Sequence, residues 1–179
     1  MAFEKELERE LSFAPYIENV LAQNAGLIHA AGIQVFSMQK ASSKDDMENG
    51  FDFVFTMGNF TVPVRIRKPD CKYRDFTIRS RSKFGLPTEY HKLLNGAGDV
   101  YFYAWTIWID GGEEISEWWL INLERFRKSG LLKTQRTEIS NGDGTKFIHF
   151  KFSELLKYDC VISNSPTRPE QNRQQLNIF

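Results

Sequence analysis

Apolar residues spaced by three or four positions predict helices in the first part of the chain. Between residues 2 and 11 the apolar side chains recur at i, i+4 and i+8, on one stripe of a helix (Phe3, Leu7 and Leu11). A second helix is expected to begin at Pro15, because proline is favoured in the first turn of a helix. Its inward positions are Ile17, Val20 and Leu21. Residues 33–36 are expected to begin a strand, and an acidic loop is expected over 41–50.

Alternation with a period of two predicts strands in the rest of the chain. Residues 51–56 and 62–67 alternate around Met57-Gly58-Asn59, which is typical of a β-hairpin. Pro63 lacks a backbone donor and predicts a bulge or an unpaired side in the second strand. Residues 99–109 are apolar on both faces, so this strand is expected to be central and covered on both sides. A further strand is expected over 75–80. Residues 117–121 are expected to pair with 99–109 as a hairpin around Asp110-Gly111-Gly112, and residues 134–139 with 146–152 around Asn141-Gly142-Asp143-Gly144.

Short helices are expected between these strands, over 89–95 with Thr88 as N-cap, over 122–126 with Asn122 as N-cap, and at 153–156. Together the elements predict an α/β (α+β) fold with one mixed, largely antiparallel sheet flanked by the N-terminal helices and shorter ones. The chain has 179 residues, of which 41% are hydrophobic and 14% aromatic, enough for one packed core. We expect a single globular domain over residues 1–162.

Charge and cysteine content exclude several classes of protein. The formal net charge is zero, so a nucleic-acid surface has to come from local clustering of basic residues. The two cysteines, Cys71 and Cys160, and the three histidines, His29, His91 and His149, show no metal-ligand spacing. No apolar run is long enough to span a bilayer, and the acidic N-terminus lacks the features of a signal peptide. A cytoplasmic protein without a membrane partner is therefore expected.

Basic residues are concentrated between positions 65 and 83. This segment contains eight of them and only two acidic residues, Asp70 and Asp75. We call them the basic belt: Arg65, Arg67, Lys68, Lys72, Arg74, Arg79, Arg81 and Lys83. On strands, residues two apart share a face, so Arg65 and Arg67 are expected to point the same way. Aromatic residues available for stacking are interleaved (Tyr73, Phe76 and Phe84), which favours contact with DNA. The alternative is a solvated sheet face paired with acids elsewhere in the chain, such as the N-terminal glutamates.

The order of elements over residues 3–110 resembles the core of the PD-(D/E)XK nuclease-like superfamily, the restriction-endonuclease-like core. In that core a helix precedes a hairpin whose first strand carries an Asp and whose second carries Glu/Asp-x-Lys. Asp52 stands at the position of the metal-binding Asp. Thirteen residues later, where the family has Glu/Asp-x-Lys, this chain has Arg65-Ile66-Arg67.

The resemblance implies a Mg²⁺-dependent nuclease, and the departure from its motif leaves catalysis open. If the protein cleaves, Asp52 and Glu89 would hold the metal and Arg67 would steady the scissile phosphate. One of the N-terminal glutamates is another candidate ligand (Glu4, Glu6, Glu8 or Glu10). However, Arg65 in place of a second carboxylate would repel a divalent ion. The alternative is that Asp52 forms an ordinary cross-strand ion pair with Arg65 or Arg67.

The tail over residues 163–179 has a polar part and an apolar end. Ser163 to Gln174 contains no aliphatic or aromatic residue, so it is expected to be disordered on its own. It is followed by Gln175, Leu176, Asn177, Ile178 and Phe179. This pentapeptide resembles the one by which many bacterial DNA-processing proteins dock on the replicative sliding clamp, with Ile178 as a conservative departure. The alternative is a tail that packs on its own core.

These features predict a DNA-associated protein of bacterial or phage origin that binds DNA through the basic belt and the clamp through its tail. A non-enzymatic regulator or inhibitor, competing for the peptide pocket of the clamp, is the alternative. A self-contained domain whose tail closes its own fold is a second alternative. No cofactor is expected other than Mg²⁺, and that only if the protein is a nuclease.

Overall fold

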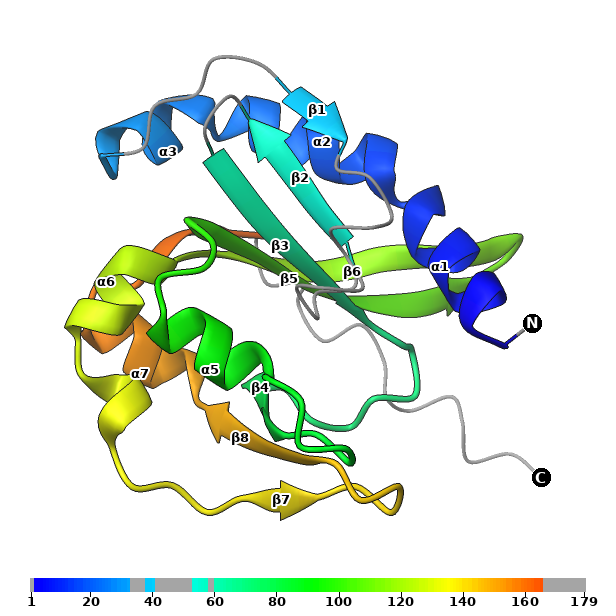
Figure 1. The fold of residues 1–179 in the computed structure, drawn as a ribbon. Helices are drawn as coiled ribbons and strands as arrows, with labels where there is room; N and C mark the ends of the chain where they lie inside the picture. The colour runs from blue at the N-terminus through cyan, green and yellow to red at the C-terminus, as the bar shows by residue number, and fades with distance from the viewer. Residues whose placement is uncertain (1, 33–37, 41–52, 58–59, 166–179) are drawn as a thin grey trace.

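The computed structural model describes residues 2–32, 38–40, 53–57 and 60–165. Within these ranges the chain forms a six-stranded sheet and a separate three-stranded sheet, with helices on both sides of the larger sheet. Figure 1 shows the N-terminal helices along one side of the six-stranded sheet and the smaller sheet on the other. The predicted mixed α+β class is confirmed. The predicted strand at 33–36 and the acidic loop at 41–50 lie outside the described residues.

Three helices form the N-terminal layer: α1 (Ala2–Ser12), α2 (Ala14–Gln23) and α3 (Ala25–Ala30). The first two confirm the prediction from apolar spacing. In α2 the proline lies in the first turn, and the inward residues Ile17, Val20 and Leu21 are buried as expected. α3 was not predicted, because its six residues span fewer than two helical turns and are too few to show a helical period.

The six-stranded sheet has the order β1-β2-β3-β5-β6-β9. Its strands are β1 (Met38–Lys40), β2 (Phe53–Met57), β3 (Phe60–Arg67), β5 (Val100–Ile109), β6 (Gly112–Asn122) and β9 (Val161–Asn164). The two hairpins predicted for these strands are confirmed, since β2 pairs with β3 and β5 pairs with β6, each antiparallel. β3 and β5 are parallel, with Val64 opposite Phe102. Pro63 lies opposite Val54 without a register shift, so β3 has no bulge there.

The three-stranded sheet has the order β4-β8-β7 and is antiparallel. It consists of β4 (Phe76–Arg81), β8 (Lys146–Phe150) and the short β7 (Ile139–Ser140). We predicted one sheet, and this second sheet is a correction. Its strands had been recognised, but β4 pairs with a strand from the far end of the chain rather than with its sequence neighbours. Such a long-range pairing leaves no mark in the local alternation of residues.

Short helices pack beside this second sheet: α5 (Glu89–Leu94), α6 (Leu123–Lys128), α7 (Phe152–Lys157) and a 3₁₀ turn at Leu131–Lys133. All three α-helices were predicted. The side chain of Asn122 accepts a hydrogen bond from the backbone N–H of Arg125, so it caps α6 as expected. Gly96 follows α5 with a φ of 90°, in the left-handed region where glycine is favoured.

Two cores lie on the two faces of the six-stranded sheet, and β5 contributes to both. Phe102 and Ala104 belong to the core beneath the N-terminal helices. The residues between them and beside them, Tyr101, Tyr103 and Trp105, belong to the core shared with the second sheet. β5 is therefore central and covered on both faces, as its apolar composition predicted.

The fold continues past residue 162, the boundary expected from composition. Ser163 and Asn164 lie in β9, paired with Leu120 and Trp119 of β6. Ser165 is buried, and its side-chain oxygen accepts a hydrogen bond from the backbone N–H of Trp118 at 3.0 Å. Residues 166–179, including the clamp-like pentapeptide, lie outside the described part of the chain. Among the described helices, none has the length and apolar character needed to cross a bilayer.

Candidate nucleic-acid interface

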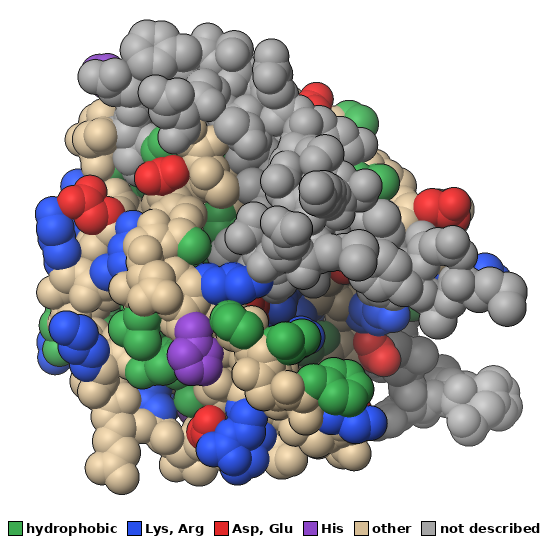
Figure 2. Space-filling view, viewed as in Figure 1, with side chains coloured by type: hydrophobic (Ala, Val, Ile, Leu, Met, Phe, Trp, Pro, Cys, Tyr) green, Lys and Arg blue, Asp and Glu red, His purple; other side chains and the backbone are tan. Residues whose placement is uncertain are grey.

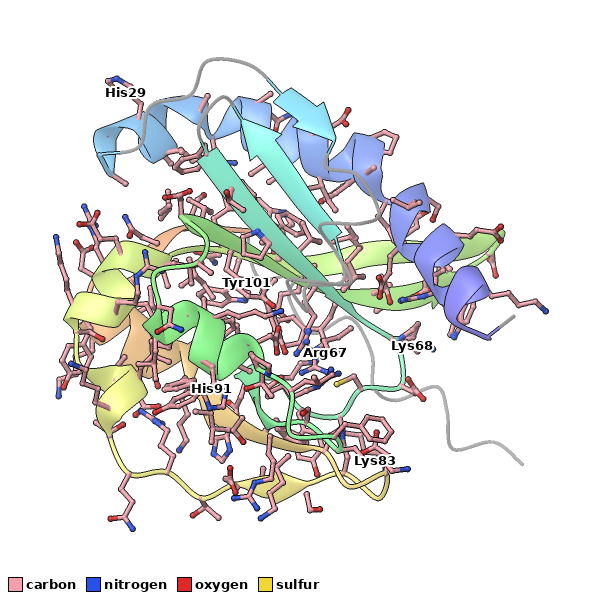
Figure 3. The ribbon with its side chains drawn as sticks, in the orientation of Figure 1. His29, Arg67, Lys68, Lys83, His91 and Tyr101 are labelled. Carbon is pink, nitrogen blue, oxygen red and sulfur yellow. The ribbon has the colours of Figure 1, made fainter. Side chains whose placement is uncertain are left out.

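Strand alternation on β3 separates its apolar and basic side chains. Val64 and Ile66 belong to the core beneath the N-terminal helices. Arg65 and Arg67 share the opposite face, which looks toward β4, as predicted. In Figure 3 Arg67 lies between the two sheets and Lys68 lies where β3 leaves the larger sheet. The end of β3 thus places consecutive cations at the junction of the two sheets.

A pocket of about 410 Å³ opens at this junction. Its walls come from α1, the end of β3, the connection to β4, β4 itself, and the β7–β8 turn with the start of β8. We call it the basic pocket, because its lining includes one acid, Glu10, and five cations: Arg65, Arg67, Lys68, Arg79 and Lys146. Four of these cations are members of the basic belt. The pocket therefore collects half of the belt in one concave site.

Arg65 is held by a buried carboxylate. Its Nη2 lies 2.8 Å from Oε1 of Glu89, and its Nη1 donates to the backbone carbonyl of Thr77 at 3.4 Å. Arg65 is 7% exposed and Glu89 is 1% exposed. The same Oε1 accepts from the hydroxyl of Tyr101 at 2.7 Å, and Oε2 accepts from the backbone N–H of Arg79 at 2.7 Å. Both oxygens of Glu89 are thus engaged by protein donors.

The described residues do not fit the Mg²⁺ site that the nuclease resemblance implies. A metal at Glu89 would have to displace the donors from Arg65, Tyr101 and Arg79, and it would lie beside a guanidinium. Among the residues that the structure describes, no group of three or more His, Cys, Asp or Glu could hold a metal ion. Asp52 lies outside the described residues, as does any pair it forms with Arg65 or Arg67.

Arg67 is oriented by Tyr103 on the neighbouring strand. Its Nε donates to the hydroxyl of Tyr103 at 2.7 Å, and its guanidinium carbon lies 5.5 Å from the centre of that ring. The hydroxyl is itself 2.9 Å from Oγ1 of Thr77. Within the described part of the chain, the Nη atoms of Arg67 make no hydrogen bond or ion pair. Arg67 is therefore held in place with two donor groups that no described residue occupies, and such groups suit a phosphate.

The other members of the basic belt lie outside the pocket. Arg74 lies 4.0 Å from Glu117 and over the ring of Trp105, and Arg81 lies 3.7 Å from Glu138. These two follow the alternative of a solvated face paired with acids elsewhere. Lys72 and Lys83 are exposed. The belt is thus divided, and only Arg65, Arg67, Lys68 and Arg79 converge.

Lys146 is a pocket residue that the sequence prediction missed. It lies opposite Arg81 in the β4–β8 register, and its Nζ is 3.2 Å from Glu138. Its position could have been inferred only by pairing β4 with β8, because the two strands are far apart in the chain. The β7–β8 turn was predicted as a hairpin turn, but the contribution of its Asn141 and Thr145 to the pocket was missed for the same reason.

The three aromatic residues of the belt have different environments. Phe76 is fully buried in the core between the sheets, so the expectation that it could stack on bases is wrong. Tyr73 and Phe84 are 57% and 79% exposed. Tyr73 lines the basic pocket, and its ring meets that of Phe147 edge-on at 6.4 Å. Figure 2 shows Lys and Arg side chains next to hydrophobic ones on the lower half of the visible face, where the second sheet lies.

The histidines do not converge on the pocket. His29 lies on α3, His149 on β8 and His91 on α5. His91 has a local role, since its Nδ1 lies 2.9 Å from Oγ1 of Thr88 at the start of α5. The residues that line the pocket instead include cations, hydroxyl-bearing side chains and aromatic rings, which together suit the binding of an anion.

The chain was compared with protein families, with curated proteins and with solved structures, and it matches none of them.

Proposed function

We propose that this is a DNA-associated protein that binds phosphate groups in the basic pocket and docks on a bacterial sliding clamp through Gln175 to Phe179. The observation that carries the DNA-binding part is the convergence of four belt cations and Lys146 on one concave site. The clamp-binding part rests on the sequence of the pentapeptide. A cytoplasmic location in a bacterium or an infecting phage belongs to the same proposal.

The balance of charge supports an anionic ligand. Glu89 and Glu138 offset Arg65 and Lys146, and Glu10 is the acid in the lining. Arg67 and Arg79 line the pocket without a carboxylate partner for their guanidinium groups among the described residues. Guanidinium groups match the geometry of phosphate oxygens and bind them through paired donors. The pocket therefore retains a positive field where a phosphate would enter.

The hydrogen bonds made by both carboxylate oxygens of Glu89 favour a protein that binds DNA without cleaving it. Its oxygens accept from three donors, and none of them is free for a metal unless that network is rearranged. This observation favours the non-enzymatic form of the proposal, in which the protein occupies DNA and the clamp rather than cutting a strand.

Salt-dependent DNA binding tests the proposal. The affinity for a fluorescent oligonucleotide, followed by anisotropy, should fall steeply with salt, because each phosphate contact releases counterions. Arg67→Ala and Arg79→Ala should each weaken binding and lower the slope of log K against log salt by about 1. Arg125→Ala is the matched control. Arg125 lies on α6, away from the pocket, and pairs with Asp159, so its removal should leave the affinity and the salt slope unchanged. Equal effects of all three variants would contradict a localised site.

Cys71 provides a second test, independent of charge changes. It lines the basic pocket and is half-buried, whereas Cys160 is fully buried, and burial raises the pKa of the Cys160 thiol to about 11. Alkylation near pH 8 should therefore modify Cys71 first. A bound oligonucleotide should slow this modification, measured by mass spectrometry, with the slow reaction of Cys160 as internal control. Unchanged Cys71 reactivity under saturating oligonucleotide would place the DNA elsewhere.

A further inference from the structure

We infer that the basic pocket takes a phosphate of an unpaired DNA strand whose neighbouring bases stack on the exposed rings of Tyr73 and Phe84. The inference rests on the proposed DNA-binding function and specifies the form of DNA. It draws on three features: the depth of two of the cations, the size of the pocket, and two exposed rings, one in the pocket lining and one on the turn after β4.

Two of the five cations, Arg65 and Arg67, lie deep in the pocket, whereas Lys68 and Arg79 are exposed. Arg65 is almost fully buried, and Arg67 is half-buried between the two sheets, held there by the hydroxyl of Tyr103. A volume of about 410 Å³ is that of a site for a small ligand rather than of a long groove. A single strand can bend one phosphate into such a site. In a duplex each phosphate is fixed on the outside of a stiff cylinder.

Tyr73 stands at one border of the pocket. It belongs to the connection between β3 and β4, and its ring contacts Phe147 on β8, which also lines the pocket. This edge contact orients the ring while leaving more than half of the side chain exposed. A base attached to the bound phosphate would meet a ring that is already positioned.

Phe84 lies in a tight turn that follows β4. The backbone N–H of Gly85 donates to the carbonyl of Ser82 at 3.4 Å, and the hydroxyl of Ser82 donates to the carbonyl of Leu86 at 3.0 Å. Gly85 has a φ of 71°, which favours glycine and closes the turn directly after Phe84. The phenylalanine therefore lies at the tip, in solvent.

This turn lies next to the pocket. It follows β4, whose last residue Arg81 lies opposite Lys146 of the pocket lining. Lys83 lies beside the β7–β8 turn. Its Cγ is 3.8 Å from the point where a Cβ would lie if residue 144 were not glycine. Figure 3 shows Lys83 at that turn. Phosphate-binding cations flanked by exposed rings are the arrangement by which proteins bind single strands, because only unpaired bases have free faces for stacking.

The test compares one oligonucleotide as a single strand and as a duplex of the same length and salt. Anisotropy should show at least about tenfold tighter binding of the single strand. Tyr73→Ala and Phe84→Ala should each weaken single-strand binding several-fold and leave duplex binding unchanged. Tyr73→Trp and Phe84→Trp should retain it. Tyr158→Ala, an exposed tyrosine at the end of α7, is the matched control and should have no effect.

The outcomes separate this inference from the proposed function. Equal or tighter duplex binding, with single-strand binding unaffected by Tyr73→Ala and Phe84→Ala, overturns the inference and leaves DNA binding intact. Absence of binding to either form overturns both. Both side chains are exposed, so circular dichroism of the two alanine variants should match the wild type, and a loss of binding then reports on the ligand contact.

Discussion

The carboxylate of Glu89, at the first position of α5, lies 2.8 Å from the guanidinium of Arg65 on β3, and both side chains are buried. The pair joins the six-stranded sheet to the helix beside the second sheet. Through the backbone N–H of Arg79 it also reaches β4. Because both charges are shielded from water, each loses its hydration and is stabilised by the opposite charge of its partner. Arg65 lines the basic pocket, so the same ion pair both shapes the pocket and connects the six-stranded sheet to α5 and β4.

Removal of one partner of this pair should destabilise the fold strongly. Glu89→Ala leaves the charge of Arg65 buried without its partner, and we expect a loss of about 3–5 kcal/mol in the free energy of unfolding. Urea denaturation followed by tryptophan fluorescence measures it. Glu124→Ala, in the exposed pair with Lys128, is the control and should show no measurable change.

The double variant Arg65→Met/Glu89→Leu separates charge from packing. It removes both charges and should recover most of the stability lost in Glu89→Ala, because no buried charge remains unpaired. If the double variant is no more stable than Glu89→Ala, the hydrogen bonds from Tyr101 and Arg79 matter more than the ion pair.

The engaged state of Glu89 also predicts the behaviour with divalent ions. Incubation of labelled single-stranded and duplex DNA with the protein and Mg²⁺ or Mn²⁺ should give no cleavage products on a denaturing gel, because a metal would have to displace the donors around Glu89. Cleavage that disappears in Asp52→Ala and in Glu89→Gln would reverse this expectation. It would restore the metal-dependent nuclease implied by the resemblance of residues 3–110.

The buried thiol of Cys160 predicts a loss of stability at alkaline pH. Burial raises its pKa from 9.0 to about 11, so the folded state keeps the proton that the unfolded state releases. This contribution is complete below pH 9 and declines as the pH rises toward 11. Unfolding measured at intervals from pH 8 to 10.5 should show a shallower decline for Cys160→Ala than for the wild type. Parallel curves would show that the thiol does not contribute.

Clamp docking predicts that the last five residues act separately from the fold. Deletion of residues 175–179, or Phe179→Ala, should abolish binding to a purified bacterial sliding clamp, measured by surface plasmon resonance. Thermal stability and oligonucleotide binding should be unchanged. Asn177→Ser is the control within the motif, because the clamp peptide that it resembles has a small polar residue at that position. A deletion that lowers stability would instead favour a tail packed on its own core.

Local patterns predicted the elements of this fold well where neighbouring segments pair. The β5–β6 hairpin follows from two apolar strands around Asp110-Gly111-Gly112, and α6 follows from the capping side chain of Asn122. Each depends on residues close in the chain. The separate second sheet could not be predicted in this way. Its strand β4 pairs with β8, and the two long strands β5 and β6 of the other sheet lie between them in the sequence.

The candidate site was predicted in part, for a related physical reason. Alternation places Arg65 and Arg67 on one face, and the structure confirms it. Alternation does not tell whether a face meets solvent or a second layer. The prediction of Phe76 as a surface ring is therefore wrong, since Phe76 is buried. The prediction of Glu89 as a metal ligand could not include its buried ion pair with Arg65. Lys146 required knowledge of the β4–β8 register.

The pairing of Phe76 with Phe150 has a consequence for the order in which the protein assembles. β8 has to be synthesised before β4 finds its partner, and the closure of so long a loop is entropically slow. β3, β5 and β6 can pair earlier, since they are nearer in the chain. The basic pocket needs walls from β3, β4 and β8 together, so a growing chain lacks it until almost the whole domain has left the ribosome. Under the proposed function, DNA binding would then be confined to finished molecules, because an incomplete chain with exposed arginines has no formed pocket.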